Sequence, residues 1–241
     1  QIELNNISLK LDTKVTLDIL KNTDFDDFVF STGIEPRIPK IDGIDSQNVL
    51  TYSDVLLDKK NVGKSVAIIG AGGIGFDTAE FLAHNPAHKP TSLDKEAFYK
   101  EWGINIEHNT PGAVMEKISE KSFREIYLLQ RKKTKLGKSL GKTTGWIHRQ
   151  SLVDKGINMI KGVQYDKIDS SGLHITVDGK KDILKIDTII LCAGQISVNK
   201  LYEEFKMIDN RNCHLIGGAE KAFEIDAKRA IDQGVRLAYS F

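Results

Sequence analysis

The sequence has 241 residues, of which 40% are hydrophobic and 28% charged, and its formal net charge is +1 at pH 7. This is the composition of an ordinary globular protein, and the balanced charge gives no reason to expect nucleic acid or a membrane surface as a partner. No apolar run approaches the ~18 residues of a membrane span and no signal-peptide pattern is present, so we expect a cytoplasmic protein with one large or two small domains.

The two cysteines, Cys192 and Cys213, lie 21 positions apart without a CxxC pair or clustered histidines. This spacing indicates neither a dithiol centre nor a metal site. We expect Cys192 to pack within a strand.

The sequence of the first sixty or so residues predicts short strands and helices, and it contains no glycine-rich strand–helix unit. Alternation predicts a strand at Asp12–Leu17, and DDFVFS predicts another at Asp26–Ser31, which leads into Gly33. A helix is expected at Val49–Leu57. We expect this part to be the latter portion of a domain that needs an upstream segment.

The chain is organised around Ser65–Ala83, where a short apolar strand meets a glycine-rich turn and an amphipathic helix. Gly70, Gly72 and Gly75 give the pattern GxGxxG. The first glycine permits the tight turn, the second permits close approach of a pyrophosphate, and the third permits close helix–strand packing.

The start of this helix has unpaired N–H groups and a partial positive charge that favour phosphate binding. We therefore predict that Gly73, together with the three glycines of the motif, binds a dinucleotide. The alternative is a glycine-rich turn that serves packing alone.

An insertion at residues 85–122 separates this helix from the next strand, predicted at Glu125–Leu129. It is polar and contains three prolines, and Asp94–Trp102 within it predicts a helix. A structureless loop of this length is unusual, so we expect a functional or packing appendage.

The end of that strand is basic. The stretch Ile126–Val153 contains no Asp or Glu. Arg131 and Lys132 are the first basic residues within it. In a Rossmann unit an acidic residue here holds the 2′-OH of NAD, whereas cations accommodate a 2′-phosphate. The sequence therefore favours NADPH, and the alternative is a set of solvated loop charges. The run Gly137–Thr144 fails the P-loop spacing, and His148 is expected to be structural.

The remaining elements complete the domain. They are a helix end at Gln150–Lys155, a strand at Gly156–Ile160, a meander at Val163–Ile168, Leu173–Val177 and Ile183–Ile186, and an apolar strand at Thr188–Cys192. This last strand ends in Ala193 and Gly194, as the strand before Gly33 ends in small residues.

Four segments resemble the bacterial NADPH-dependent 2,4-dienoyl-CoA reductases, which belong to the old-yellow-enzyme and trimethylamine dehydrogenase-like flavoproteins with two dinucleotide-binding domains. They are GIEPRIPKIDGI at Gly33–Ile44, IIGAGGIGFDTA at Ile68–Ala79, LGKTTGWIHR at Leu140–Arg149 and HLIGGAEKAFEIDAKRAI at His214–Ile231.

The resemblance implies an α/β architecture with a Rossmann-type NADPH domain and part of a discontinuous FAD domain. The implied bounds are 1–61 for part of the FAD domain, 62–191 for the NADPH domain and 192–241 for the return segment of the FAD domain. It also implies an upstream TIM barrel carrying FMN and a [4Fe–4S] cluster, so that this chain alone is expected to be inactive.

By the same resemblance, Arg131 and Lys132 lie near the NADPH 2′-phosphate, and four residues contribute to a partial FAD site: Val15, Gly33, Gly218 and Glu220. A helix from Ile225 would direct its N-terminus at the flavin. Glu220 stands where the relatives have Asp.

We therefore predict the electron-entry part of a flavin-dependent 2,4-dienoyl-CoA reductase of fatty acid metabolism, with no catalytic side chain in this chain. The alternatives are another NADH:flavin oxidoreductase of the trimethylamine dehydrogenase type, and a non-catalytic nucleotide-binding module.

Overall fold

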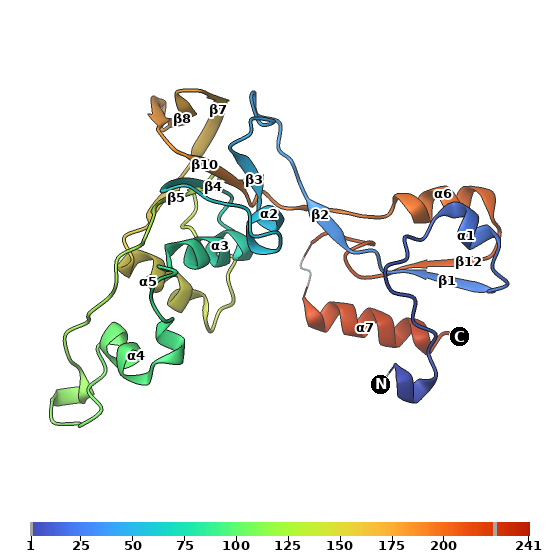
Figure 1. Cartoon of the computed structure of the whole chain (residues 1–241), viewed down its shortest axis with the longest axis horizontal. Coiled ribbons are helices and arrows are strands. Elements are labelled where there is room, and N and C mark those ends of the chain that lie inside the picture. The colour runs from blue at the N-terminus through green and yellow to red at the C-terminus, as the bar shows by residue number, and fades with distance from the viewer. Residues whose placement is uncertain (1, 224–225) are drawn as a thin grey trace. The chain divides into compact units, whose positions relative to one another are not determined.

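The computed structural model describes residues 2–223 and 226–241, which form two compact units. One unit comprises residues 36–194, and the other combines the described residues up to Glu35 with those from Gln195 onward. Figure 1 shows the elements of both, coloured along the chain. The predicted bounds of an NADPH and an FAD domain stay predictions.

The larger unit is built on a five-stranded parallel sheet in the order β3–β10–β4–β5–β6. Its central strand β4, Ser65–Ile69, pairs with β10 on one side and with β5 on the other. The strand order therefore reverses at β4. The other strands are β3 Val49–Thr51, β5 Glu125–Gln130, β6 Asn158–Lys161 and β10 Thr188–Leu191. The predicted α/β fold with a Rossmann-type parallel sheet is confirmed.

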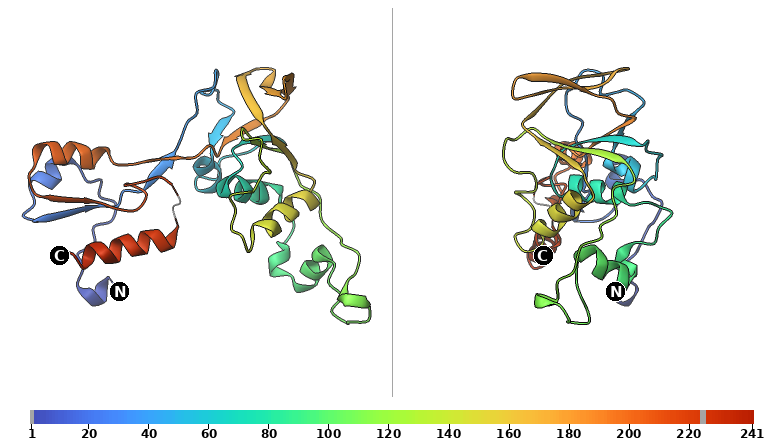
Figure 2. Two further views of the ribbon diagram at one scale, coloured as in Figure 1. Left: turned by 180° about the vertical axis from the view of Figure 1, so that it is seen from behind. Right: turned by 90° about the vertical axis from the view of Figure 1, so that its left-hand side faces the viewer.

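Different layers cover the two faces of this sheet, as Figures 1 and 2 show. Helices α3, Gly73–Ala83, and α5, Gly145–Asp154, cover one face, and Phe76, Leu152 and Ile68 belong to the buried cluster between them. An antiparallel meander covers the other face, built from β7 Val163–Asp169, β8 Gly172–Val177 and β9 Lys180–Leu184. Burial on both faces explains the continuous apolar runs of β4 and β10.

The third meander strand begins three residues earlier than predicted. A two-residue turn at Asp178 and Gly179 places Val177 opposite Lys180, so pairing starts directly after the turn. Lys180 and Lys181 are exposed on this edge strand, which is why a charged pair is tolerated there.

The helix predicted at Val49–Leu57 is wrong in its first part. Strand β3 takes its first three residues and pairs with β10, and helix α2, Tyr52–Leu56, follows. A capping box explains the boundary, because Asp54 N–H donates to Thr51 Oγ1 at 3.2 Å and Thr51 N–H donates to Asp54 Oδ2 at 2.7 Å.

This capping box predicts an acid-sensitive contribution to stability. Lys60, followed by the hydroxyl and N–H of Thr51, lowers the pKa of Asp54 from 3.8 to about 2. A depressed folded-state pKa stabilises the protein above the unfolded pKa, and this contribution is lost as pH falls from about 4 towards 2. We expect Asp54→Asn to cost about 1 kcal/mol at pH 7 and to flatten the pH dependence of unfolding in that range. Urea titrations of both proteins between pH 2 and 7 measure this, and an unchanged slope would contradict it.

The smaller unit contains a two-stranded parallel sheet of β1, Asp27–Phe30, and β12, Asn212–Leu215. Phe28 and Phe30 on β1 pack with Phe205 in a small aromatic core. The other elements are 3-10 turn η1 Glu3–Asn5, helices α1 Leu17–Lys21, α6 Lys200–Ile208 and α7 Ala227–Ala238, and the paired strands β2 Ile34–Pro36 and β11 Gln195–Ser197. The predicted start of the last helix, Ile225, lies outside the described residues.

The strand predicted at Asp12–Leu17 is wrong. Residues 13–16 pair with no described strand, and Thr16 instead caps α1 by accepting from Ile19 N–H at 3.4 Å. Alternating side chains form a strand only where a neighbouring strand supplies hydrogen bonds, and the described part of the chain supplies none here.

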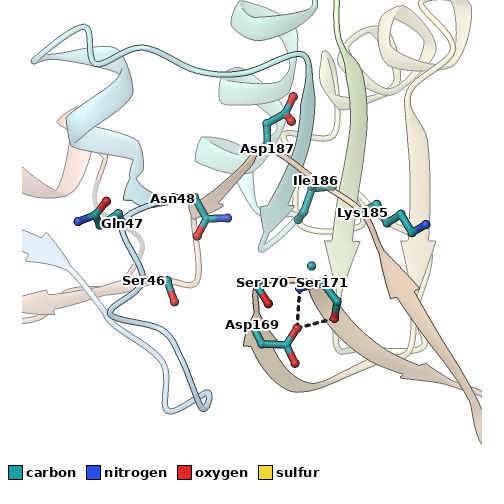
Figure 3. A pocket seen from close by; sticks show the side chains of 10 residues that line it. Ser46, Gln47, Asn48, Asp169, Ser170, Ser171, Lys185, Ile186 and Asp187 are labelled. Carbon is teal, nitrogen blue, oxygen red and sulfur yellow. Dashed lines mark hydrogen bonds between the residues drawn. The ribbon is translucent and has the colours of Figure 1, made fainter.

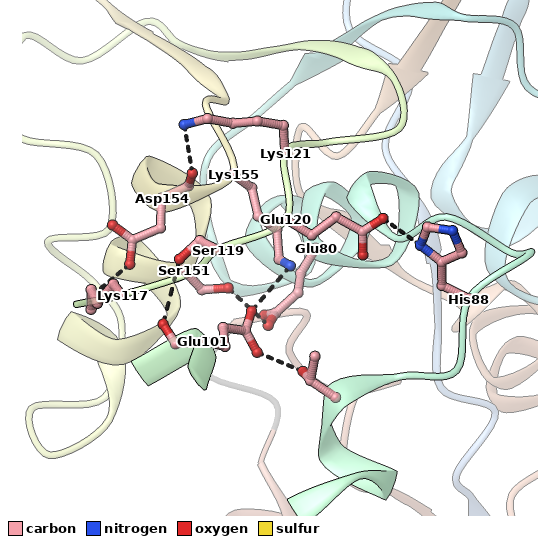
Figure 4. Close-up of polar contacts among 11 residues, drawn as sticks. Glu80, His88, Glu101, Lys117, Ser119, Glu120, Lys121, Ser151, Asp154 and Lys155 are labelled. Atoms are coloured by element: carbon pink, nitrogen blue, oxygen red, sulfur yellow. Dashed lines mark hydrogen bonds and ion pairs between the residues drawn. The ribbon is translucent and has the colours of Figure 1, made fainter. Parts of the chain in front are cut away.

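The insertion holds a short helix and little core. Helix α4, Lys95–Trp102, confirms the predicted helix, and Asp94 caps it by accepting from Ala97 N–H at 3.1 Å. Figure 4 shows polar contacts between the insertion and the end of α5. Among them are the ion pairs of Glu101 with Lys155 at 3.3 Å and of Lys117 with Asp154 at 2.8 Å. The insertion also contains 3-10 turns η2 Thr91–Leu93 and η3 Pro111–Ala113.

Candidate functional site

The glycine-rich turn lies at the carboxyl end of β4, where the strand order reverses. Gly70 N–H donates to Leu129 O of β5 at 2.9 Å, and its φ of +118° suits glycine. A Cβ at Gly70 would lie 2.2 Å from Cys192 O, at the end of β10. The turn is therefore enclosed by the ends of both neighbouring strands.

Gly75 is required by helix packing. A Cβ there would lie 1.9 Å from Gly70 O, so no other residue allows α3 to pack this closely on the turn. Gly70 and Gly75 thus serve the fold whether or not a ligand binds.

Gly72 and Gly73 have no such structural cause. A Cβ on either would meet nothing within 4 Å, and Gly72 caps α3 with ordinary extended dihedral angles and no side-chain hydrogen bond. The start of α3 therefore has open space beside Gly72 and Gly73, where a pyrophosphate bound at a helix N-terminus would lie. A purely structural turn would not need glycine at these two positions, so they fit a dinucleotide.

The predicted basic residues lie beside this turn. The pairing of Ile69 with Leu129 places Gln130 level with Gly70, and Arg131 and Lys132 follow as exposed residues. Burial raises the pKa of Tyr165 on β7, and the positive charge of Arg131 opposes part of that rise. The structure therefore brings the predicted phosphate-binding residues and the glycine turn to one edge of the sheet.

The loop after these residues packs over the start of α3. Leu136 is buried, and a Cβ on Gly137 would lie 3.0 Å from the Phe76 ring of α3. Lys133 pairs with Asp178 at 3.3 Å, whereas no ion pair is found for Arg131 or Lys132 within the described residues. Their charges stay available to an anion.

His148, which the sequence predicts to be structural, contacts the neighbouring helix. Its Nδ1 lies 3.2 Å from Glu80 Oε2 and links α5 to α3, and Ser151 donates to the other oxygen of Glu80 at 3.4 Å. Cys192 is buried immediately after β10, beside Thr78, and burial raises the pKa of its thiol to about 12. Both cysteines are free thiols.

Sequence reasoning missed Arg37 as an individual residue of this edge. Its guanidinium donates to Ala193 O, and its N–H donates to Gly194 O at 3.0 Å. Arg37 thereby fixes the carboxyl end of β10 next to the glycine turn. The partners are more than 150 positions apart in the chain, so no local sequence pattern indicates this contact.

The predicted FAD residues lie in the smaller unit. Gly33 follows β1 with a φ of +78° and open space at its Cβ position, and Gly218 follows β12, where a Cβ would lie 2.8 Å from Ile34. The Glu220 carboxylate accepts from Gln233 of α7. Val15 is 45% exposed. The role of these four residues in FAD binding stays a prediction.

A cavity of about 760 Å³ lies elsewhere in the larger unit and contains none of the predicted site residues (Figure 3). Its Asp187 is already committed, accepting from Lys64 and Ser65 N–H at 2.8 and 2.9 Å, and Asp169 accepts from Ser171 and His174. Both carboxylates of this cavity are thus engaged within the fold.

Comparison with known proteins shows which family this chain belongs to. A family model described as pyridine nucleotide-disulphide oxidoreductase matches residues 2–214. The chain belongs to this family. Members bind a pyridine nucleotide, which agrees with the open glycine turn at the end of β4.

Individual relatives in this family are distant. The chain is 24% identical over 219 residues to cinnamate reductase from Clostridium sporogenes, covering 91% of this chain and 27% of that protein. It is 23% identical over 172 residues to mercuric reductase from Lysinibacillus sphaericus, covering 70% and 24%. The structure of a 2-naphthoyl-CoA reductase complex matches with a TM-score of 0.75 at 22% identity, covering 98% of this chain and 30% of that one. The chain spans about a quarter of the length of these curated relatives.

Within residues 2–223 and 226–241, no group of three or more His, Cys, Asp or Glu side chains is placed to hold a metal ion. None of the described helices combines the length and the apolar character that crossing a membrane demands.

Proposed function

We propose that this chain is the NADPH-binding, electron-entry part of a flavin-dependent 2,4-dienoyl-CoA reductase. The single observation that carries the proposal is the juxtaposition of an open glycine turn with an exposed basic loop. Gly72 leaves room for a pyrophosphate, and Arg131 and Lys132 are free to bind a phosphate beside it. The family segments quoted above, LGKTTGWIHR in particular, support the narrower assignment.

The chain's own residues would position the cofactor rather than react. The N–H groups of the first turn of α3 would hold the pyrophosphate, and the basic side chains would hold the 2′-phosphate. Bound NADPH supplies a hydride, which a flavin accepts. In the smaller unit, Gly33, Gly218 and Glu220 would line part of an FAD site. The proposal places FMN, a [4Fe–4S] cluster and a TIM barrel in other parts of the whole protein.

Calorimetric titration with NADPH and NADH tests the cofactor assignment. We expect NADPH to bind more tightly, and the double variant Arg131→Ala with Lys132→Ala to lose about 1.5 to 3 kcal/mol of NADPH binding while NADH binding is unchanged. The charge loss explains this, because only NADPH carries the 2′-phosphate.

The matched control is Lys180→Ala with Lys181→Ala, which removes the same charge from the exposed edge strand β9. It should leave both affinities unchanged. Equal wild-type affinities for the two nucleotides would contradict the proposal and favour an oxidoreductase of the trimethylamine dehydrogenase type. If the chain bound neither NADPH nor NADH, the proposed cofactor assignment would lose its support.

A further inference from the structure

Gln130 occupies the position that decides which ribose a Rossmann site accepts. It is the last residue of β5, directly after Leu129, whose carbonyl accepts from Gly70 of the glycine turn. An acidic side chain at this strand end holds the 2′-OH of NAD. Gln130 has the length of Glu but carries an amide that can donate hydrogen bonds.

The Gln130 amide is turned into the loop that follows it. Its Nε2 donates to Lys132 O at 2.9 Å and to Thr134 O at 2.8 Å, with Thr134 Oγ1 at 3.3 Å. Backbone carbonyls only accept, so both amide hydrogens are used and the nitrogen must face the loop. A carboxylate at this position has no hydrogen to offer and would repel both carbonyl oxygens.

A second contact holds the other side of the same loop. Gly162 N–H, between β6 and β7, donates to Lys132 O at 3.2 Å, so this carbonyl receives hydrogen bonds from two directions. The backbone of residues 131–134 is thereby fixed between two strands, while the side chains of Arg131 and Lys132 stay exposed.

We infer that Gln130 is a positioning residue that sets the selectivity for a 2′-phosphorylated nucleotide. This rests on the proposed NADPH function. By holding the carbonyls of Lys132 and Thr134, the amide keeps the loop in the form that directs its cations at the 2′-phosphate. Because the amide nitrogen donates both of its hydrogens to the loop, it is not available to the ribose.

The test uses 2′,5′-ADP and 5′-ADP as probes, since they differ only by the 2′-phosphate, with the purified chain. Wild type should bind 2′,5′-ADP more tightly. Gln130→Met keeps the length but loses both donors, and should lose about tenfold of this preference with unchanged 5′-ADP affinity. Gln130→Glu should lose at least as much and gain affinity for 5′-ADP and NADH.

The control is Gln164→Met, which removes an exposed amide whose partner is Asp166 at 3.1 Å on β7. It should leave both affinities unchanged. Wild-type preference that persists within about twofold in both Gln130 variants would overturn the inference while leaving the proposed function intact. An equal loss for both probes would show a merely structural role and also overturn it. Equal wild-type binding of the two probes would instead overturn the proposed function, and the inference with it.

Discussion

Replacing Gly75 with Ala should destabilise the larger unit by about 3 kcal/mol or more, because the new methyl group would collide with a backbone oxygen. The added Cβ lies 1.9 Å from Gly70 O, and no rotamer change relieves a contact made by Cβ itself. Helix α3 would have to shift away from β4, opening the cluster around Phe76. Urea unfolding followed by circular dichroism measures the loss.

Gly72→Ala is the matched control within the same motif. Its Cβ would meet nothing within 4 Å, so stability should change by less than about 1 kcal/mol. The same methyl group would occupy the space predicted for the pyrophosphate, and NADPH affinity should fall at least about tenfold. If Gly72→Ala bound NADPH like wild type, the packing-only interpretation of the turn would gain; a stable Gly75→Ala would refute the packing argument.

Phe205→Ala should unfold the smaller unit without unfolding the larger one. The ring is fully buried and lies 4.8 Å from Phe28 and 6.2 Å from Phe30, measured between ring centroids. Among the described residues, Leu20 is the one other buried member of this cluster, and partly buried side chains such as Leu201 and Leu215 pack against it. Removing a buried Phe side chain costs about 3 to 5 kcal/mol, which a core this small cannot absorb.

Hydrogen exchange measured by mass spectrometry separates the two units. Peptides from β1 and β12 should lose protection in Phe205→Ala, whereas those from β4 and β5 should keep it. Met207→Ala on the same helix is the control, because Met207 is 82% exposed and its truncation removes little packing. Retained protection of β1, or equal loss in both units, would contradict the prediction.

The parallel sheet and the glycine turn could be predicted because their causes are local. An apolar run of four residues followed by GxGxxG specifies a buried strand, a turn and a helix start within about fifteen residues. The basic loop could be predicted equally well, since a long stretch without acidic residues is visible in the sequence alone. The motif also indicated that Gly70 serves the turn and Gly75 the helix packing. What the sequence did not reveal is that a Cβ on Gly70 would collide with Cys192 O, because that atom lies far along the chain.

Elements that depend on distant partners were harder to predict. Residues 12–17 alternate like a strand, yet the described chain offers them no neighbouring strand. Val49–Thr51 joins the sheet because β10 supplies its hydrogen bonds, although β10 lies far along the chain. No sequence pattern predicts the contact of Arg37 with Ala193 or the hydrogen bonds of the Gln130 amide to its own loop.

The discontinuous smaller unit has a consequence for the order of folding. Its strands β1 and β12 pair Phe30 with Leu215, and residues 36–194 form a separate unit between them. Closing so long a loop in an unfolded chain is entropically costly and slow. Once the larger unit has folded, Arg37 N–H is bonded to Gly194 O, so the intervening segment starts and stops at one place. During synthesis on the ribosome, β12 and Phe205 emerge after the whole of the larger unit, so the aromatic core of the smaller unit is completed late.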